Sequence, residues 1–430
     1  MLRYEQLYIE DKKINLDNFK NIYVIGAGKA SGAMAGAIEN ILMKRITSGL
    51  VCVKYEYGVR LHKILTAEAG HPVPDENSYL AARKTYDLVQ KCGVNDLIIC
   101  LISGGASSIW ALPHPPIPFQ DKQKTTEILL GCGADIHELN VIRRHISRIK
   151  GGQLAKAAYP AKLVTLAISD VVGNKISSIG SGPTVPDPST FTEALEIILK
   201  YKLSESLPAS VTNHLWAGTK GEIKETPKPG DSLFKGYIEC IVANNSTALE
   251  SAKQTAKYLG FKVEIFSTEL TGEAREVGIK LAEKAKRVKQ NKPPGSPPVL
   301  LLSGGETTVI LKGDGKGGRN QELVLAAAIE LDKQDGIMAV SFGTDGTDGE
   351  KGDKGDTGDT GTNGTNGTNG TLGLPAAPAA PAFTPPVIIN GGPTGGNVSL
   401  LPAKTSWIIA WLNTSGTALN LVPGDPNNSN

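Results

Sequence analysis

Three glycine-containing segments place a charged or hydroxyl side chain where it could contact an anion. Gly26 and Gly28 precede Lys29 in NIYVIGAGKASG, and Ser-Gly-Gly occurs at 103–105 and again at 303–305. Glycine lets backbone N–H groups approach a phosphate closely, and the N-terminus of a following helix favours negative charge. The repeated Ser-Gly-Gly segment favours contact with an anion or nucleotide. For the first segment, a tight turn without a ligand is an equal alternative.

The first segment matches neither common phosphate-binding motif in full. The dinucleotide fingerprint has a third glycine where this chain has Ser31, and an acidic residue about 20 positions on, for which Glu56 comes late. A Walker A loop has Ser or Thr after its lysine, where this chain has Ala30. The sequence therefore leaves open whose phosphate this turn would hold.

Several other polar or charged residues could take part in a site or could be structural. Asp170 comes directly after KLVTLAIS, so we expect it at the carboxyl edge of a sheet, where it could accept a proton from a hydroxyl or cap a turn. Arg319 stands just outside a helix that we expect Asn320 to cap, and it could clamp an anion or lie on the surface. Asn244 is most simply a helix cap, and we expect His71 to be structural.

Strand-like and helical patterns alternate from residue 21 to about 342, which predicts an α/β fold with largely parallel sheets in two domains. The first domain is expected to be Rossmann-like and the second a smaller α/β domain. The segment Asn140–Gly152 predicts a basic helix with a solvated face, Lys150 being the one exception. The expected strands are NIYVI, GLVCVK, DLIICLI, KLVTLAI, YIECIVA, KVEIF, PPVLLL and IMAVSF.

Composition narrows the function classes. The 430 residues carry a formal net charge of +2 without a long basic run, which argues against nucleic-acid binding. No apolar stretch is long enough to span a membrane, and the start lacks a secretory signal. The five cysteines are scattered singly, which argues against a disulfide framework or a zinc site. A cytoplasmic location fits best.

Glycine occupies every third position from Gly343 to Gly373, which is the period of collagen. The intervening positions hold no proline, so we expect a flexible tether rather than a stable triple helix, and folding of the preceding domains that does not depend on it. A linker rich in Pro and Ala and an uncertain tail follow. The predicted divisions are 1–235, 236–348, 349–373 and 374–430.

In order along the chain, several segments resemble the class II glycerate 2-kinases, the MOFRL family. The resemblance covers roughly residues 20–349. Each segment alone is a weak signal, and only the segments taken together are specific to the family. GGPTGGNVSLL, Gly391–Leu401, has a faint likeness to the family's closing loop, which we attribute to coincidence. The matching segments are VIGAGKASGAMA, AGHPVPDENS, LISGGASS, LNVIRRHISRIKGGQLA, AISDVVGNKISSIGSGPTVPDPST, LLSGGETTV, GRNQELVLAAA and SFGTDGTDG.

The resemblance implies ATP-dependent phosphorylation of D-glycerate at its 2-hydroxyl with Mg²⁺, in a cleft between two α/β domains. Lys29 and Arg319 would supply positive charge, and Asp170 would take the proton of the attacking hydroxyl. Glu306 and Asp345 are candidate Mg²⁺ ligands by position. The residues expected to contact substrate or nucleotide are Gly26, Gly28, Ser103, Gly104, Gly105, Asn244, Ser303, Gly304, Gly305 and Asn320.

The chain departs from the family where the glycine repeat replaces the expected last strand, helix and loop. We therefore expect a truncated second domain, whose activity is in doubt. The alternatives are an NAD(P)-dependent hydroxypyruvate reductase, and a collagen-like structural or surface protein that carries a kinase-like domain. Lys29 and the displaced third glycine favour the kinase. Self-association is open, and we do not expect a trimer through the repeat.

Overall fold

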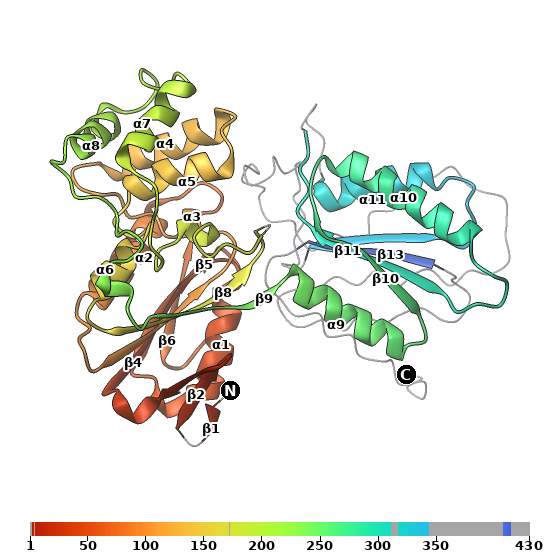
Figure 1. Ribbon diagram of the computed structural model, residues 1–430, viewed down its shortest axis with the longest axis horizontal. Coiled ribbons are helices and arrows are strands. Elements are labelled where there is room, and N and C mark those ends of the chain that lie inside the picture. Colours follow the sequence, from red (N-terminus) through yellow and green to blue (C-terminus); the bar gives the residue numbers. More distant parts are fainter. Residues whose placement is uncertain (1, 4, 172, 311–316, 344–406, 414–430) are drawn as a thin grey trace. The chain divides into compact units, whose positions relative to one another are not determined.

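The chain divides into two compact units, Met1–Asn244 and Asn245–Asn430, each built on a parallel sheet (Figure 1). The sequence analysis placed the boundary at 235/236, in the polar stretch before the last strand of the first sheet. The structure is a computed structural model, and it describes residues 2–3, 5–171, 173–310, 317–343 and 407–413.

The first unit contains a six-stranded sheet in which every neighbouring pair is parallel. Its order is β6-β5-β4-β7-β8-β9, so the chain starts in the middle, moves to one edge, and then returns to build the other half. This is the strand order of the Rossmann fold. The strands are β4 (Asn21–Ala27), β5 (Ser48–Lys54), β6 (Ile64–Ala69), β7 (Asp96–Ile102), β8 (Lys162–Ser169) and β9 (Ile238–Asn244).

Both faces of this sheet are covered, which explains why its strands are nearly continuous apolar runs. Every residue of β7 is buried, and its alternate side chains enter two separate apolar cores. Helix α1 (Ser31–Leu42) contributes to one core, whereas α2 (Glu76–Val89) and α6 (Gln153–Ala158) contribute to the other.

The sequence did not predict the N-terminal sheet of the first unit, and it predicted helices in three parts of a helical group without predicting that they share a core. A small antiparallel sheet opens the chain, formed by β1 (Leu2–Arg3), β2 (Gln6–Ile9) and β3 (Lys12–Asn15). A helical group with its own apolar core consists of α4 (Phe119–Gly131), α5 (Ile136–His145), α7 (Phe191–Lys200) and α8 (Ala209–Thr219).

The second unit contains a four-stranded sheet of order β10-β11-β13-β12, again parallel throughout. Helix α9 covers one face and α10 and α11 cover the other, so this sheet is also a buried middle layer (Figure 1). The elements are α9 (Asn245–Tyr258), β10 (Lys262–Leu270), α10 (Ala274–Gln290), β11 (Val299–Gly305), α11 (Arg319–Glu330), β12 (Met338–Gly343) and β13 (Trp407–Asn413).

Strand β13 comes from the region after the glycine repeat. It lies between β11 and β12, with Ile408 aligned to Leu300 on one side and to Met338 on the other. The sequence analysis assigned these residues to an uncertain tail outside the second domain, whereas the structure places them inside its sheet. The glycine repeat itself lies outside the described residues, apart from Gly343, which ends β12.

The predicted α/β class and every predicted strand are confirmed, with two local corrections. The basic helix expected over Asn140–Gly152 ends at His145, and Arg144, His145 and Lys150 are buried rather than solvated. Arg144 pairs with Asp187, His145 Nε2 lies 3.1 Å from Glu225 Oε2, and Lys150 donates to the Ser107 carbonyl oxygen. Helix α11 begins at Arg319 with Gly318 as its N-cap, so Asn320 lies inside the helix instead of capping it.

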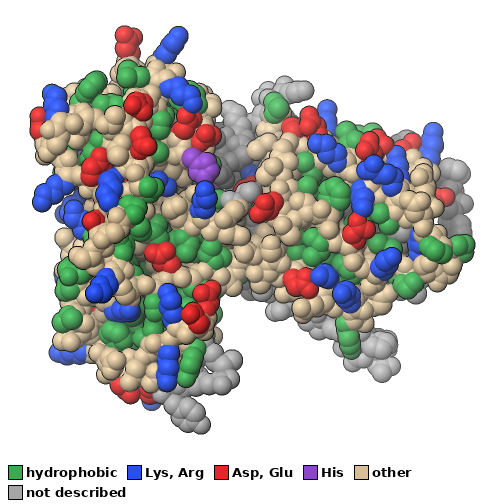
Figure 2. All heavy atoms as spheres, in the orientation of Figure 1, with side chains coloured by type: hydrophobic (Ala, Val, Ile, Leu, Met, Phe, Trp, Pro, Cys, Tyr) green, Lys and Arg blue, Asp and Glu red, His purple; other side chains and the backbone are tan. Residues whose placement is uncertain are grey.

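Acidic and basic side chains are interspersed over the face drawn in Figure 2. Within the described residues, no helix is both long and apolar enough to cross a membrane. All five cysteines are free thiols.

Candidate functional site

The strand order of the first unit identifies where a ligand is expected. The chain leaves β4 for β5 on one side, and β7 pairs with β4 on the other side, so their carboxyl ends flank a topological switch point. Ligands of open α/β sheets bind at this point, because the loops that leave the two strands diverge there. Lys29 follows β4 and Ser103–Gly105 follow β7, so both predicted segments lie there.

The glycines after β4 allow the neighbouring strand and loop to come close. A Cβ atom on Gly26 would lie 2.6 Å from the Leu101 carbonyl oxygen, and one on Gly28 would lie 2.2 Å from Ser103 Oγ. Gly28 has a φ of 130°, which also favours glycine. Ser103 Oγ accepts a hydrogen bond from the Ala30 N–H at 3.0 Å. The space beside these glycines is therefore occupied by protein.

Asp170 and the Lys29 backbone meet at the first Ser-Gly-Gly segment. Asp170 directly follows β8, and its carboxylate lies against Gly104, since a Cβ atom there would be 2.0 Å from Asp170 Oδ2. The Lys29 N–H donates to the Gly104 carbonyl at 2.8 Å. Lys29 and Asp170 are both half-buried. The structure thus brings together a lysine and a carboxylate that lie far apart in the sequence.

His71 also contacts this segment. A Cβ atom on Gly105 would lie 2.9 Å from His71 Cδ2 and 3.4 Å from Lys29 Cγ, and Gly105 itself has a φ of 85°. Burial and the nearby charges of Lys29 and Lys54 hold the pKa of His71 well below its ordinary value. A neutral imidazole therefore borders the site, although the sequence analysis treated His71 as structural. Its position in a turn with two prolines was the only available signal.

Asn244 lies at the same edge of the first sheet. It ends β9 and is aligned with Ser169, the residue before Asp170. The register of β8 and β9 thus places Asn244 beside the start of the loop that carries Asp170.

The second Ser-Gly-Gly segment is part of a strand rather than a loop. Residues 303–305 end β11 and are aligned with residues 411–413 of β13. A Cβ atom on Gly304 would lie 2.0 Å from Asn245 Oδ1, and one on Gly305 would lie 2.1 Å from the Leu270 carbonyl oxygen. These glycines therefore admit the first residue of α9 and the end of β10.

Arg319 and Glu306 form an ion pair in the second unit. Arg319 Nη1 lies 2.6 Å from Glu306 Oε1, and Arg319 is only 6% exposed. Arg319 is thus neither solvated nor on the surface, and Glu306, a candidate metal ligand, contacts a guanidinium group. Asp345 lies outside the described residues.

Three buried hydrogen-bond donors of the second unit have no partner within the described residues. They are Ser303 Oγ, Thr307 Oγ1 and Asn320 Nδ2. Asn320 Oδ1 accepts from Ser341 Oγ at 2.7 Å, which leaves the amide nitrogen as the unpaired atom. A buried donor without an acceptor costs about 1–3 kcal/mol, so a ligand rich in acceptor oxygens would suit this set. Thr307 is not among the site residues expected from the sequence.

Within the described ranges, no group of three or more His, Cys, Asp or Glu side chains could hold a metal ion. Mg²⁺ commonly binds through one or two carboxylates together with phosphate oxygens of the substrate. The geometry around Glu306 does not form a complete protein site, because Arg319 occupies its Oε1 atom.

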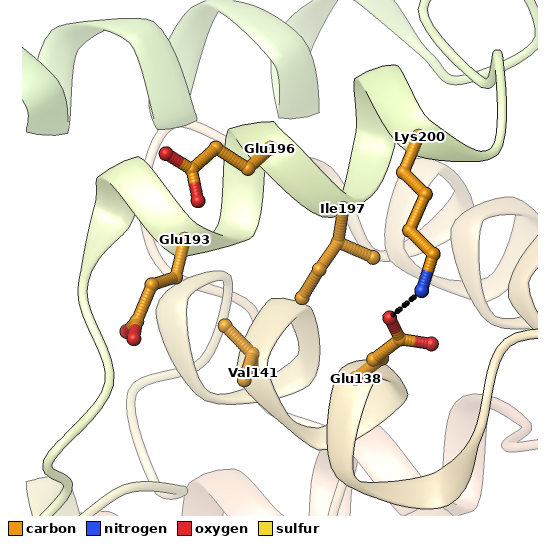
Figure 3. Close-up of a pocket in the computed structure, with 6 residues that line it drawn as sticks. All are labelled: Glu138, Val141, Glu193, Glu196, Ile197 and Lys200. Carbon is orange, nitrogen blue, oxygen red and sulfur yellow. Dashed lines mark hydrogen bonds and ion pairs between the residues drawn. The ribbon is translucent and has the colours of Figure 1, made fainter.

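A shallow pocket between α5 and α7 does not belong to this site (Figure 3). Glu138 and Glu193 line it, and each completes the capping box of its own helix. Lys200 pairs with Glu138 at 2.6 Å, and Glu196 adds a further negative charge. Because three carboxylates surround one lysine, the pocket does not suit a phosphate.

Two family models match the chain. The MOFRL family model matches residues 299–399, and the model of a domain of unknown function, DUF4147, matches residues 2–216. The MOFRL match includes most of Gly391–Leu401, so our attribution of that stretch to coincidence was wrong.

Relatives are similar over most of the chain. A glycerate 2-kinase of Pyrococcus horikoshii is 40% identical, and the alignment covers 79% of this chain and 76% of the relative. A protein of Agrobacterium vitis, provisionally named a hydroxypyruvate reductase, is 44% identical, and the alignment covers 75% of this chain and 72% of the relative. The solved structure of Thermotoga maritima glycerate kinase has a TM-score of 0.65 at 39% identity and covers 74% of each chain. The chain therefore belongs to the class II glycerate kinase family, the MOFRL family.

Proposed function

We propose that the protein is a D-glycerate 2-kinase, which transfers the γ-phosphoryl group of ATP to the 2-hydroxyl of D-glycerate. Glycerate kinases are among its relatives over most of the chain. The observation that carries the proposal is the contact of the Asp170 carboxylate with Gly104 at the switch point of the first sheet. This contact fixes a proton acceptor beside the loop that also bonds to the Lys29 backbone.

Asp170 is assigned as the general base. Its carboxylate takes the proton of the 2-hydroxyl while the hydroxyl oxygen bonds to the γ-phosphorus. The bond from that phosphorus to the β–γ bridging oxygen breaks, and ADP leaves. Because such a transition state needs little covalent help, catalysis depends on position and on compensation of charge.

Lys29 and Arg319 are assigned to compensate the negative charge of the phosphates. Ser303, Thr307 and Asn320, whose donors have no partner within the described part of the chain, are assigned to phosphate oxygens, since these oxygens only accept hydrogen bonds. Mg²⁺ is taken to arrive as part of the nucleotide co-substrate, where the phosphates are its principal ligands.

A hydroxypyruvate reductase is the second candidate, because the first sheet has the strand order of dinucleotide-binding folds and one relative bears that provisional name. Close packing after β4 argues against it. A dinucleotide pyrophosphate approaches the backbone at the second glycine of its fingerprint, whereas here Ser103 Oγ fills the space beside Gly28.

The test is an assay of the full chain with ATP, MgCl₂ and D-glycerate. ADP should form in step with 2-phosphoglycerate, which enolase consumes directly. A parallel assay follows NADH with hydroxypyruvate. Oxidation of NADH without any ADP formation would reject the kinase and support the reductase.

We also propose a cytoplasmic location, for which the five free thiols are the support.

A further inference from the structure

Four polar side chains form a hydrogen-bonded row in the first unit. We call Lys150, Ser107, Ser181 and Asn140 the Lys150 row. Lys150 Nζ lies 3.2 Å from Ser107 Oγ, Ser107 Oγ lies 2.8 Å from Ser181 Oγ, and Ser181 Oγ donates to Asn140 Oδ1 at 2.8 Å. All but Ser107 are fully buried. The row therefore opens to its surroundings at Ser107.

The hydrogen bonds of the row run in one direction. Asn140 Oδ1 can only accept, so the single proton of Ser181 is used there. Ser107 must then donate to Ser181, which leaves Ser107 Oγ to accept from Lys150. Lys150 also donates to the Ser107 carbonyl at 2.8 Å and reaches the Gly180 carbonyl at 3.5 Å. The ammonium group thus faces three neutral oxygens.

Lys150 is a buried amine that pairs with no carboxylate in the described part of the chain. It is 1% exposed, and the nearby charges are Lys122, which is also buried, and Arg143. Burial and these two cations hold the pKa of Lys150 well below its ordinary value. A buried charge is costly unless an opposite charge compensates it. An anion beside Ser107 would favour the protonated, charged form of Lys150.

Ser181 is held in a conformation that serine rarely adopts. Its φ is 62°, and it lies between Gly180 and Gly182 with similar angles. Glycine at this position would avoid the strain, so the serine is explained by its hydroxyl, which joins Ser107 to Asn140. The row is incomplete at its far end, since Asn140 Nδ2 has no partner among the described residues.

The half-buried member of the row, Ser107, is close to the proposed base. Ser107 belongs to α3 (Ala106–Ile109), which begins directly after Gly105, whereas Asp170 lies against Gly104. Ser181 lies in the loop that Asp170 begins. The row therefore joins the two loops that carry the proposed base and its neighbouring glycines.

We propose that the Lys150 row binds the carboxylate of the hydroxy-acid substrate, an inference that rests on the proposed function. Ser107 is the contact: its proton turns from Ser181 to a carboxylate oxygen when the substrate binds. Lys150 is a positioning residue that donates to Ser107 Oγ and supplies the positive charge behind it. The row thus selects acids over neutral polyols with the same hydroxyl groups.

The experiment compares D-glycerate with its neutral amide, D-glyceramide, on the full chain. The Kd of each is measured by calorimetry for the wild-type chain and for Lys150→Met, which keeps length and removes charge. The variant should bind D-glycerate at least ~10-fold more weakly, because a charge-assisted contact is lost. Its affinity for the amide should change less than about threefold, and its melting temperature should not fall, since an apolar side chain replaces a buried amine that has no carboxylate partner in the described residues.

Neighbouring serines provide a matched control if Lys150→Met does not fold. Ser107→Ala should reduce the preference for acid over amide, whereas Ser108→Ala should not, because Ser108 Oγ donates to the Gly105 carbonyl and is outside the row. Equal losses for acid and amide in Lys150→Met, or an unchanged preference in Ser107→Ala, would overturn the proposal. Failure of the wild-type chain to phosphorylate D-glycerate would instead reject the proposed function.

Discussion

The same tripeptide, Ser-Gly-Gly, occurs at the carboxyl edge of each parallel sheet, and its serine has a different role in each. Ser103 Oγ accepts from the buried Ala30 N–H, so the first serine ties the turn after β4 to the turn after β7. Ser303 Oγ is equally buried but has no partner in the described part of the chain. The first serine is paired within the protein, whereas the second keeps a buried donor that, in our proposal, a phosphate oxygen accepts.

The central glycine of each segment gives room to a side chain from another element. Gly104 makes room for the Asp170 carboxylate, whereas Gly304 makes room for the Asn245 amide. The tripeptide therefore supplies space, and the residue that fills this space sets the chemistry. A carboxylate suits removal of a proton, and an edge rich in neutral donors suits binding of phosphate oxygens.

The largest effect is expected from removal of β13, because this strand is paired with the second Ser-Gly-Gly segment. A chain that ends at residue 406 loses the strand between β11 and β12, so residues 303–305 lose their partners on that side, while Ser303 and Gly305 stay aligned with β10. We expect loss of activity and of hydrogen-exchange protection in the second unit. A chain that ends at residue 413 is the control, and equal protection in both would contradict the role of β13.

The next largest effect is expected from Asp170→Asn. Loss of the base should reduce kcat by at least ~10²-fold with a smaller change in KM for D-glycerate. Steady-state kinetics with both substrates saturating measures this. A fully active variant would show that Asp170 only shapes its loop.

Truncation of the two serines should separate a structural role from a ligand-binding role. Ser103→Ala leaves the buried Ala30 N–H unpaired, which should lower the free energy of unfolding of the first unit by about 1–3 kcal/mol. Ser303→Ala removes a donor that has no described partner, so stability should hold while KM for ATP rises. Urea unfolding read by hydrogen exchange in each unit distinguishes the two. Equal destabilisation would remove the contrast between the segments.

The smallest effect is a pH dependence at His71, beside the first segment. Its pKa is lowered in the folded chain, so below the ordinary value near 6.5 the unfolded chain binds a proton that the folded chain does not. Stability should therefore fall as pH drops below about 6.5, by up to about 1.4 kcal/mol per pH unit. His71→Asn should flatten this dependence between pH 6.5 and 5. An unchanged slope would show that other groups cause it.

Local patterns predicted the strands well, because fully buried parallel strands are continuous apolar runs such as Asp96–Ile102. They missed β6, which is only partly buried, and the short N-terminal antiparallel sheet. They could not predict that β13 joins β11 across the long segment after residue 343. Such a pairing depends on tertiary contacts rather than on the local pattern.

The sequence predicted which strand ends carry the candidate site residues, but it did not predict the contacts between their side chains. Asp170 was identified because it directly follows an apolar run, and the structure places it at a sheet edge as expected. The burial of Arg319 against Glu306 and the row from Lys150 to Asn140 depend on side chains far apart in the sequence. No spacing rule contains that information.

The matched substitutions Gly104→Ala and Gly304→Ala test the central claim most directly. Each adds a Cβ atom that would lie 2.0 Å from a polar oxygen, of Asp170 in the first unit and of Asn245 in the second. With thermal melting as a control for folding, Gly104→Ala should lower kcat and leave KM for ATP within about threefold, because it displaces the base. Gly304→Ala should chiefly raise KM for ATP. The reverse pattern, or the same change in both variants, would contradict the assignment of proton removal to one segment and phosphate binding to the other.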